Sequence, residues 1–394
     1  VLLRSSLGFN GAKFFGLIRS LVGIFLFGIQ TYFLSKILVY MIRIIIFSID
    51  NSLLDQEIFI IFYLGLNIID WFAIVITIVL QTLFFTVGMQ YNKKIINFSA
   101  MTVYAGLLIF FFVVLLSDVK ITTEAFSNIF NLNNFLDVNN LAPLLTVAGT
   151  IFAYFSILII SFGDFSRYVK NEQELKKGNL SLILNLIIFS FLSVFIVIGS
   201  DVFLNQKFSD IDRIFTNPTD IVGKFDNIQI TIVVLFFIII ASASTNLVAN
   251  FIPSQYSLIN FAPSILSLKS ASYLIAFFGL LIAIFWLTIL SQIGILSFVD
   301  TFGAFFGPLF GVMAADYYLI KNQELSNKDL YSIDKESAYY YSGGWHIKGV
   351  YSLILGFIFS ASTIWNTNLM FLQSYAWIIG AFVAWITYYL LAKK

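Results

Sequence analysis

Residues 238–251 read IIIASASTNLVANF, which places two serines, a threonine and two asparagines in the middle of a long apolar segment. The surrounding segment, roughly 229 to 254, is long enough to cross a bilayer as a helix, because about 20 mostly apolar residues suffice. An amide in hydrocarbon costs on the order of several kcal/mol unless it is paired. What these polar groups pair with therefore decides what kind of membrane protein the chain forms.

Composition sets the class of protein. Of the 394 residues, 59% are hydrophobic, 18% aromatic and 11% charged, whereas soluble domains carry about 25% charged residues. The chain is therefore predicted to be an all-α integral membrane protein whose surroundings are the lipid bilayer. The net charge of +1 gives no indication of a nucleic-acid partner, and the lack of cysteine excludes disulfides and thiolate chemistry. We expect no cofactor.

The pattern of apolar segments predicts ten spans in one transmembrane domain, residues 1–394. The segment 53 to 69, broken by Gly65 and Asn67, is either an interfacial helix or an eleventh span. The ten predicted spans are 13 to 46, 71 to 91, 95 to 117, 142 to 164, 180 to 202, 229 to 254, 270 to 290, 294 to 320, 349 to 365 and 371 to 391.

Charge distribution favours the interfacial helix. With 53 to 69 in the interface, most Lys and Arg residues fall on one side, and acids such as Asp201, Asp210 and Asp212 gather on the other. By the positive-inside rule the basic side is cytoplasmic. We therefore expect a multi-pass protein of the cell (inner) membrane with a cytoplasmic C-terminus and a cytoplasmic loop at 321–348.

The chain begins at Val1 with neither an initiator methionine nor a signal sequence. We expect a longer protein in which roughly 60 to 100 upstream residues supply two more spans of about 20 residues each.

Helical spacing divides the polar stretch into two neighbouring faces. Ala241, Ser244 and Thr245 share one face, and Asn246 and Asn250 share the next. One interpretation is helix packing, since small and hydroxyl residues let helices approach and can bond back to their own backbone. The other is a ligand-lined cavity, which two asparagines on one face favour.

A second polar centre is Gln30, which lies among aromatic residues in the first predicted span. Its amide predicts either an interhelical hydrogen bond or a ligand contact.

Four stretches together carry a family resemblance: GFNGAKFFGLIRSLVGIFLFGIQTYF (8–33), GDFSRYVK (163–170), STNLVANFIPSQYSLINFAPSIL (244–266) and FGAFFGPLFGVMAADYYLIKNQELSNKDLY (302–331). In this order and spacing they resemble the nucleobase:cation symporter-1 family, which are secondary transporters of nucleobases, hydantoins, allantoin and related vitamins. The resemblance implies an inverted-repeat (5+5) secondary-transporter fold of twelve spans, of which the chain supplies the third to the twelfth. It also implies breaks in the first and sixth family helices. In the sixth family helix this chain has Ala153 and Tyr154 in place of a glycine pair.

The resemblance assigns a partial cation site to the Ala241 carbonyl and the Ser244 and Thr245 hydroxyls. Oxygen ligands suit a hard monovalent cation such as Na⁺. The centres of the predicted spans hold no histidine and no clearly central acid, which favours sodium over a proton. An acid in upstream helices would reverse that choice.

The resemblance assigns substrate contacts to Gln30 and Asn250, whose amides each offer a donor and an acceptor. It assigns ring stacking to Phe155, where the family usually has tryptophan. Leu26 occupies the position of a second stacking tryptophan, so a flat aromatic substrate is less firmly implied.

The predicted function is a cation-coupled symporter that imports a nucleobase or related small heterocycle by alternating access. A transporter of amino acids or other small solutes with the same fold is the main alternative. A channel is disfavoured because no repeated polar filter loops occur. A membrane-embedded enzyme is disfavoured because no titratable groups cluster at one depth, and the one histidine, His346, lies in the 321–348 loop.

Overall fold

The computed structural model describes residues 2–117, 119–129, 138–207, 221, 227–292 and 294–393. Within these ranges the regular elements are helices: α1 (Leu2–Ile49), η1 (Asn51–Asp55), α2 (Glu57–Ile60), α3 (Ile68–Phe85), α4 (Met89–Ser117), α5 (Val119–Ile129), α7 (Val138–Ser166), α8 (Glu172–Lys207), α10 (Ile228–Thr245), η2 (Asn246–Phe251), α11 (Ile252–Phe261), α12 (Leu268–Phe285), η3 (Leu290–Gln292), α13 (Ile295–Ala315), η4 (Asp316–Ile320), α14 (Asn327–Tyr331), α15 (Ile347–Trp365), η5 (Thr367–Tyr375) and α16 (Ala376–Ala392).

Ten of the described helical segments are long and apolar enough to span a membrane, which confirms the predicted number and the multi-pass membrane class. The segment after α1 forms only the short helices η1 and α2, so it adds no span. The first span is longer than predicted, and the sixth runs through α10, η2 and α11 to Phe261. Asp210 and Asp212, used to orient the chain, lie outside the described residues.

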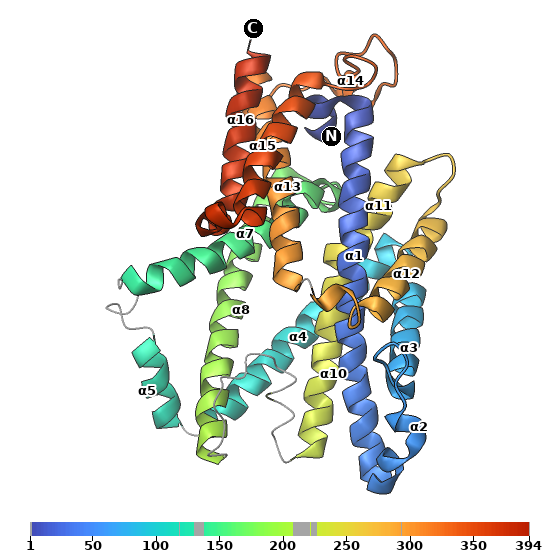
Figure 1. Ribbon diagram of the computed structural model, residues 1–394, viewed down its shortest axis with the longest axis vertical. Helices are drawn as coiled ribbons and strands as arrows, with labels where there is room; N and C mark the ends of the chain where they lie inside the picture. Colours follow the sequence, from blue (N-terminus) through green and yellow to red (C-terminus); the bar gives the residue numbers. More distant parts are fainter. Residues whose placement is uncertain are drawn as a thin grey trace.

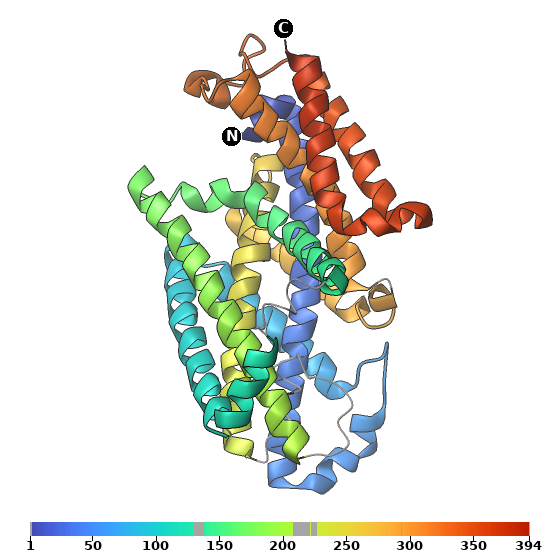
Figure 2. The same ribbon diagram turned by 90° about the vertical axis from the view of Figure 1, so that its left-hand side faces the viewer.

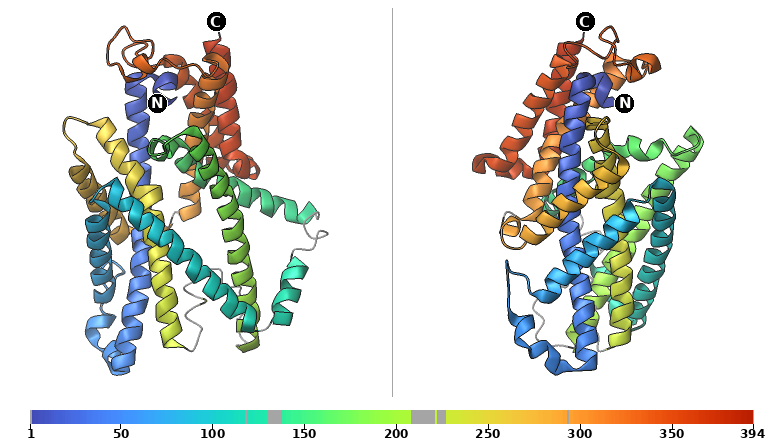
Figure 3. Two further views of the ribbon diagram at one scale, coloured as in Figure 1. Left: turned by 180° about the vertical axis from the view of Figure 1, so that it is seen from behind. Right: turned by 90° about the vertical axis from the view of Figure 1, so that its right-hand side faces the viewer.

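Helix α1 is the central element of the bundle. It runs along the long axis of the molecule and packs against α3, α10, α11, α12, α13 and α15 (Figures 1 and 3). Helices α4, α5 and α8 form a group at the far side of α10 (Figure 2). Both chain termini lie at the same end of the bundle (Figure 1), as an even number of spans requires.

The group α13, α15 and α16 is held together by small residues. Gly303, Gly307 and Gly311 form a stripe on α13, one turn apart. A Cβ on Gly307 would lie 2.4 Å from the carbonyl oxygen of Trp377, and one on Gly311 would lie 2.1 Å from that of Ala381. Glycine is required there because the backbones of α13 and α16 touch, which is a recurrent way of packing membrane helices.

The start of α1 is clamped by the loop that precedes α15. Gly8 has φ 84°, and a Cβ on it would lie 2.6 Å from the Gly344 carbonyl oxygen. The backbone N–H of Asn10 donates to that carbonyl at 2.7 Å, and the N–H of His346 donates to the Leu7 carbonyl at 2.9 Å. The predicted loop 321–348 is therefore ordered against the first turns of α1.

The position of the helix irregularities differs from the expectation. Helix α7, the sixth family helix by the resemblance, is α-helical from Val138 to Ser166, including Ala153 and Tyr154. Neither residue prefers a conformation that breaks a helix, and Pro143 lies in the first turns of α7. Among the described spans, π-helical interruptions occur instead at η2 and η4.

Candidate functional site

The sixth span changes from α- to π-helix within the polar stretch 238–251. Helix α10 ends at Thr245, the π-helical η2 covers Asn246–Phe251, and the N–H of Ile252 donates to the Leu247 carbonyl five residues earlier. A π-turn widens the helix and rotates its side chains, and such turns recur at functional sites. Both asparagines of the stretch lie in this turn.

Three amide side chains meet between α1 and η2. Asn250 Nδ2 lies 2.9 Å from Gln30 Oε1 and 2.9 Å from Asn246 Oδ1. Gln30 Nε2 donates to the Ser242 carbonyl at 3.0 Å. Asn246 and Asn250 are buried. The structure thus brings together Gln30 and Asn250, which the sequence predicted as substrate contacts, and pairs their amides with each other rather than leaving them in lipid.

The hydrogen bonds of this cluster can be counted atom by atom. Nδ2 of Asn250 has two hydrogens, and the oxygens of Gln30 and Asn246 use both. Among the described residues no donor serves Asn250 Oδ1. Nε2 of Gln30 donates one hydrogen to Ser242 and keeps the other. Two side chains joined by a hydrogen bond therefore offer a ligand one acceptor and one donor.

The cluster continues to a third helix through residues that sequence reasoning missed. Asn246 Nδ2 donates to the Phe27 carbonyl at 3.2 Å and to Thr31 Oγ1 at 3.3 Å. The Thr31 hydroxyl lies 2.8 Å from Oε1 of Gln81 on α3. The available signal was Gln81 itself, a single amide inside an apolar span, which is the same feature that drew attention to Gln30.

Arg19 is a second residue that sequence reasoning missed. Its side chain is 2% exposed; Nη2 donates to the Ala249 carbonyl at 3.0 Å and Nε donates to Ser161 Oγ on α7 at 2.7 Å. Pro253 has no N–H to give to the carbonyl four residues before it, Ala249. Arg19 therefore supplies the donor that the proline removes, and it links α1, α7 and the π-turn.

The predicted cation ligands converge on one carbonyl. Ser244 Oγ lies 3.0 Å, and Thr245 Oγ1 2.9 Å, from the Ala241 carbonyl oxygen. In this state both hydroxyls donate back to their own helix, which is the local pattern of the packing interpretation. Thr245 is exposed and the other two residues are half-buried, so the three oxygens lie together on an open face of α10.

The two predicted stacking positions lie on different helices, Leu26 on α1 one turn before Gln30 and Phe155 on α7. Leu26 is 7% exposed and packs in the core beside Val22, Ile29 and Trp286. Phe155 is half-buried, and its ring packs edge-on against Tyr154 at 5.7 Å between centroids.

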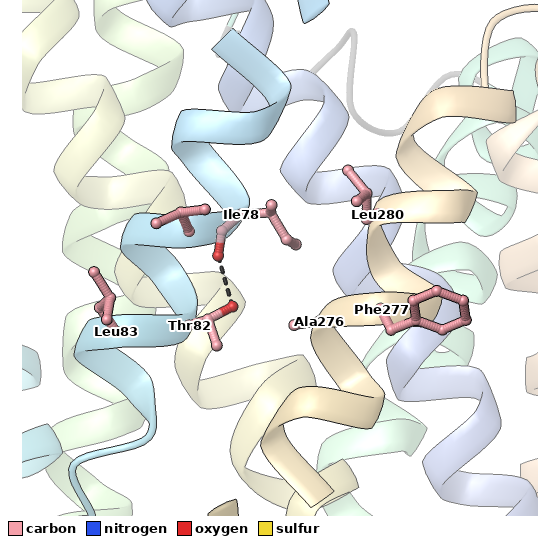
Figure 4. Close-up of a pocket in the computed structure, with 7 residues that line it drawn as sticks. Ile78, Thr82, Leu83, Ala276, Phe277 and Leu280 are labelled. Atoms are coloured by element: carbon pink, nitrogen blue, oxygen red, sulfur yellow. Dashed lines mark hydrogen bonds between the residues drawn. The ribbon is translucent and has the colours of Figure 1, made fainter. Parts of the chain in front are cut away.

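A cavity of about 260 Å³ lies elsewhere, between α3 and α12 (Figure 4). Its lining is apolar apart from Thr82, whose hydroxyl donates back to the Ile78 carbonyl at 2.6 Å. Thr82 is its one polar lining residue, and the cavity does not include the amide cluster.

Ten spans, one of which is interrupted by a π-turn beside buried amides, are features of a secondary-transporter fold. The family follows from the sequence, because residues 1–388 match the model of the permeases for cytosine/purines, uracil, thiamine and allantoin. The chain belongs to this family, which consists of permeases rather than enzymes.

The curated relatives are permeases of the same group. The chain is 24% identical over 408 residues to the purine-uracil permease NCS1 of Arabidopsis thaliana, covering 100% of this chain and 65% of the relative. It is 28% identical over 244 residues to the allantoin permease of Bacillus subtilis (strain 168), covering 62% of this chain and 48% of the relative. The matched part thus spans about half to two thirds of the length of these relatives.

Solved structures confirm the fold class. Mhp1, a nucleobase-cation-symport-1 family transporter, in a closed conformation with bromovinylhydantoin bound, superposes with a TM-score of 0.71 at 19% identity, covering 99% of this chain and 77% of Mhp1. The inward-facing conformation of Mhp1 superposes with a TM-score of 0.67 at 20% identity, covering 100% of this chain and 77% of Mhp1. The chain therefore has the all-α, inverted-repeat secondary-transporter fold.

Proposed function

We propose that this chain forms the greater part of a secondary transporter that carries a nucleobase or related small heterocycle, by alternating access and together with a monovalent cation. The observation that carries the proposal is the unused pair of groups in the amide cluster, the Asn250 Oδ1 acceptor and the second N–H of Gln30. A ring edge with a C=O beside an N–H complements that pair. Uracil, hydantoin and allantoin all carry such an edge.

The relatives support the same substrate class. Their names include purine-uracil and allantoin permeases, and the solved structure of similar fold holds a bromovinylhydantoin. Amino acids lack a cyclic C=O and N–H edge, so the cluster favours heterocycles over the amino-acid alternative.

The substrate proposal is tested by the uptake of labelled uracil, hydantoin and allantoin into liposomes that contain the intact protein. Leucine and glutamate are the comparison solutes. We expect saturable uptake of at least one heterocycle and none of the amino acids. Uptake of an amino acid, without uptake of any of the three heterocycles, would contradict the proposal.

Sodium is the proposed coupling ion. The Ala241 carbonyl and the Ser244 and Thr245 hydroxyls lie within one helical turn of each other, and oxygen ligands of this kind hold sodium. None of the three releases a proton at ordinary pH. Rotation of both hydroxyls away from Ala241 would turn their lone pairs toward a bound ion.

The double change Ser244→Ala with Thr245→Val tests the ion. It should remove the sodium dependence of heterocycle binding and leave a weak, sodium-independent affinity. Ser242→Ala, a neighbouring serine whose carbonyl rather than hydroxyl is used by Gln30, is the matched control and should keep the sodium response. Wild-type protein that accumulates substrate equally well without sodium and responds only to a pH gradient would show that the hydroxyl pair serves packing.

In this proposal the protein lies in the cell (inner) membrane with its C-terminus and the 321–348 loop in the cytoplasm. The excess of Lys and Arg on that side supports the orientation. A reporter fused after Lys394 that is active only outside the cytoplasm should stay silent.

A further inference from the structure

The amide cluster has a fixed direction. Asn250 gives hydrogens to both of its neighbours, and Asn246 receives one on Oδ1 while giving its own to α1. A reversed Asn246 amide would set Nδ2 against Nδ2 of Asn250 and Oδ1 against the Phe27 carbonyl. The Asn246 orientation therefore decides whether Asn250 keeps an oxygen or an N–H free for a ligand.

The orientation of Asn246 depends on Thr31. The Thr31 oxygen accepts from Asn246 at 3.3 Å, while its single hydrogen has two acceptors in reach, the Phe27 carbonyl at 2.7 Å and Gln81 Oε1 at 2.8 Å. When the hydroxyl hydrogen of Thr31 points to either acceptor, a lone pair of Oγ1 faces Asn246 Nδ2 and can accept its hydrogen bond. The Phe27 carbonyl also accepts from Asn246 Nδ2, so the Thr31 hydroxyl and the Asn246 amide compete for that oxygen. Gln81 Oε1 can take the Thr31 hydrogen instead and leave the Phe27 carbonyl to Asn246.

We propose that Gln81, acting through Thr31, is a positioning residue that fixes the amide of Asn246 and thereby selects ring edges with an N–H over edges with acceptors only. The inference rests on the proposed heterocycle function. It adds a third helix, α3, to a recognition site otherwise built from α1 and η2. Among the described residues, Gln81 forms its side-chain hydrogen bond with Thr31 and none with Gln30 or Asn250.

The cost of Gln81 supports a role beyond packing. The side chain is 4% exposed, and its Nε2 has no partner among the described residues. A buried unpaired N–H destabilises a fold, and an apolar side chain of the same shape would avoid the loss. The oxygen is the part of this amide that has a partner, and that partner is the Thr31 hydroxyl.

The test compares two ligands in the intact protein. Uracil, or hydantoin if that binds more tightly, carries an N–H beside a C=O, whereas 1-methyl-2-pyrimidinone carries only an acceptor nitrogen beside its C=O. The measured quantity is the ratio of the two affinities. Thr31→Val and Gln81→Met, isosteric changes on different helices, should each reduce the wild-type ratio by about 3- to 10-fold. Thr31→Ser keeps the hydroxyl and should keep the ratio.

The outcomes separate the two proposals. Equal losses of affinity for both ligands, with an unchanged ratio in either folded variant, would overturn the positioning role and leave only packing. Wild-type protein that binds neither uracil nor hydantoin would instead overturn the proposed function, and the positioning role with it. The thermal unfolding of each variant without ligand identifies a variant that fails to fold, and the other variant then decides.

Discussion

The two π-helical turns of the described chain, η2 and η4, use the same backbone irregularity for different purposes. Each begins with a fully buried polar residue, Asn246 in η2 and Asp316 in η4. In η2 the amides lead across α1 to α3 and leave an acceptor and a donor unused. In η4, Asp316 Oδ1 accepts from the Tyr388 hydroxyl at 2.6 Å.

The surroundings of η4 close it off from a ligand. The Tyr388 hydroxyl also lies 3.4 Å from His346 Nδ1, which is 3.0 Å from the Ser6 carbonyl at the start of α1. The Tyr341 ring stacks on His346 at 4.0 Å between centroids. A π-turn therefore does not by itself mark a binding site. Asp316 Oδ2 in η4 also lacks a partner among the described residues, but it is fully buried; what distinguishes η2 is an unpaired acceptor and an unpaired donor on two side chains that are joined by a hydrogen bond.

The contrast between η2 as a binding site and η4 as a structural site is tested most directly at Asn250. Asn250→Ala should weaken heterocycle binding by about 1 to 3 kcal/mol, or about 5- to 150-fold, because it leaves a polar edge of the ligand unpaired. Gln30→Ala should act in the same range. Both effects are measured by titration of the intact protein, with the exposed Asn260→Ala on α11 as control. Unchanged affinity in both variants, at normal expression, would return η2 to the packing interpretation.

The complementary change is Tyr388→Phe at η4. It removes the donor to Asp316 Oδ1 and leaves a buried carboxyl whose Oδ2 already lacks a partner among the described residues. The free energy of unfolding should fall by about 1 to 3 kcal/mol, seen as a lower melting temperature, while ligand affinity stays unchanged. Tyr389→Phe on the same helix is the matched control. A large loss of affinity with unchanged stability would show that η4 is also a ligand site.

The smallest expected effect is the pH response of the η4 surroundings. Burial lowers the pKa of His346 below its ordinary value of 6.5. The folded protein therefore binds this proton less readily than the unfolded chain, so the contribution to stability is complete above pH 6.5 and falls as the pH drops below it. The melting temperature should fall more between pH 7.5 and 5.5 in the wild type than in His346→Gln. An equal fall in both would assign the response to other groups.

The fold was predictable because apolar spans leave few alternatives. Ten runs of the right length gave ten helices, and the break at Gly65 and Asn67 was rightly kept from becoming a span, since Asn67 and Asp70 form the capping box that starts α3. The π-turns were not predictable. A π-turn depends on tertiary partners, such as Arg19 reaching the carbonyl that Pro253 leaves without a donor, and no local spacing reports such a partner.

The candidate site was predictable in part for a similar reason. Gln30 and Asn250 stand out as amides in apolar runs, and the structure places them 2.9 Å apart. Thr31 and Gln81 were missed because threonine is common in membrane helices and a single glutamine in a span has many packing explanations. The hydrogen bonds around Asn246, which no sequence pattern reports, are what connect both residues to the site.

Helix α1 beyond the Gly8 kink comprises 41 residues, Phe9 to Ile49, so it is about 60 Å long at about 1.5 Å per residue, roughly twice the hydrocarbon thickness of a bilayer. It contains no proline and no π-turn between those ends. Such a rod transmits displacement without bending. A ligand that binds at Gln30 and tilts α1 by a small angle would displace the Gly8 end together with the loop before α15 that is hydrogen-bonded to it, so the proteolysis or label accessibility of that loop would report occupancy of the distant site.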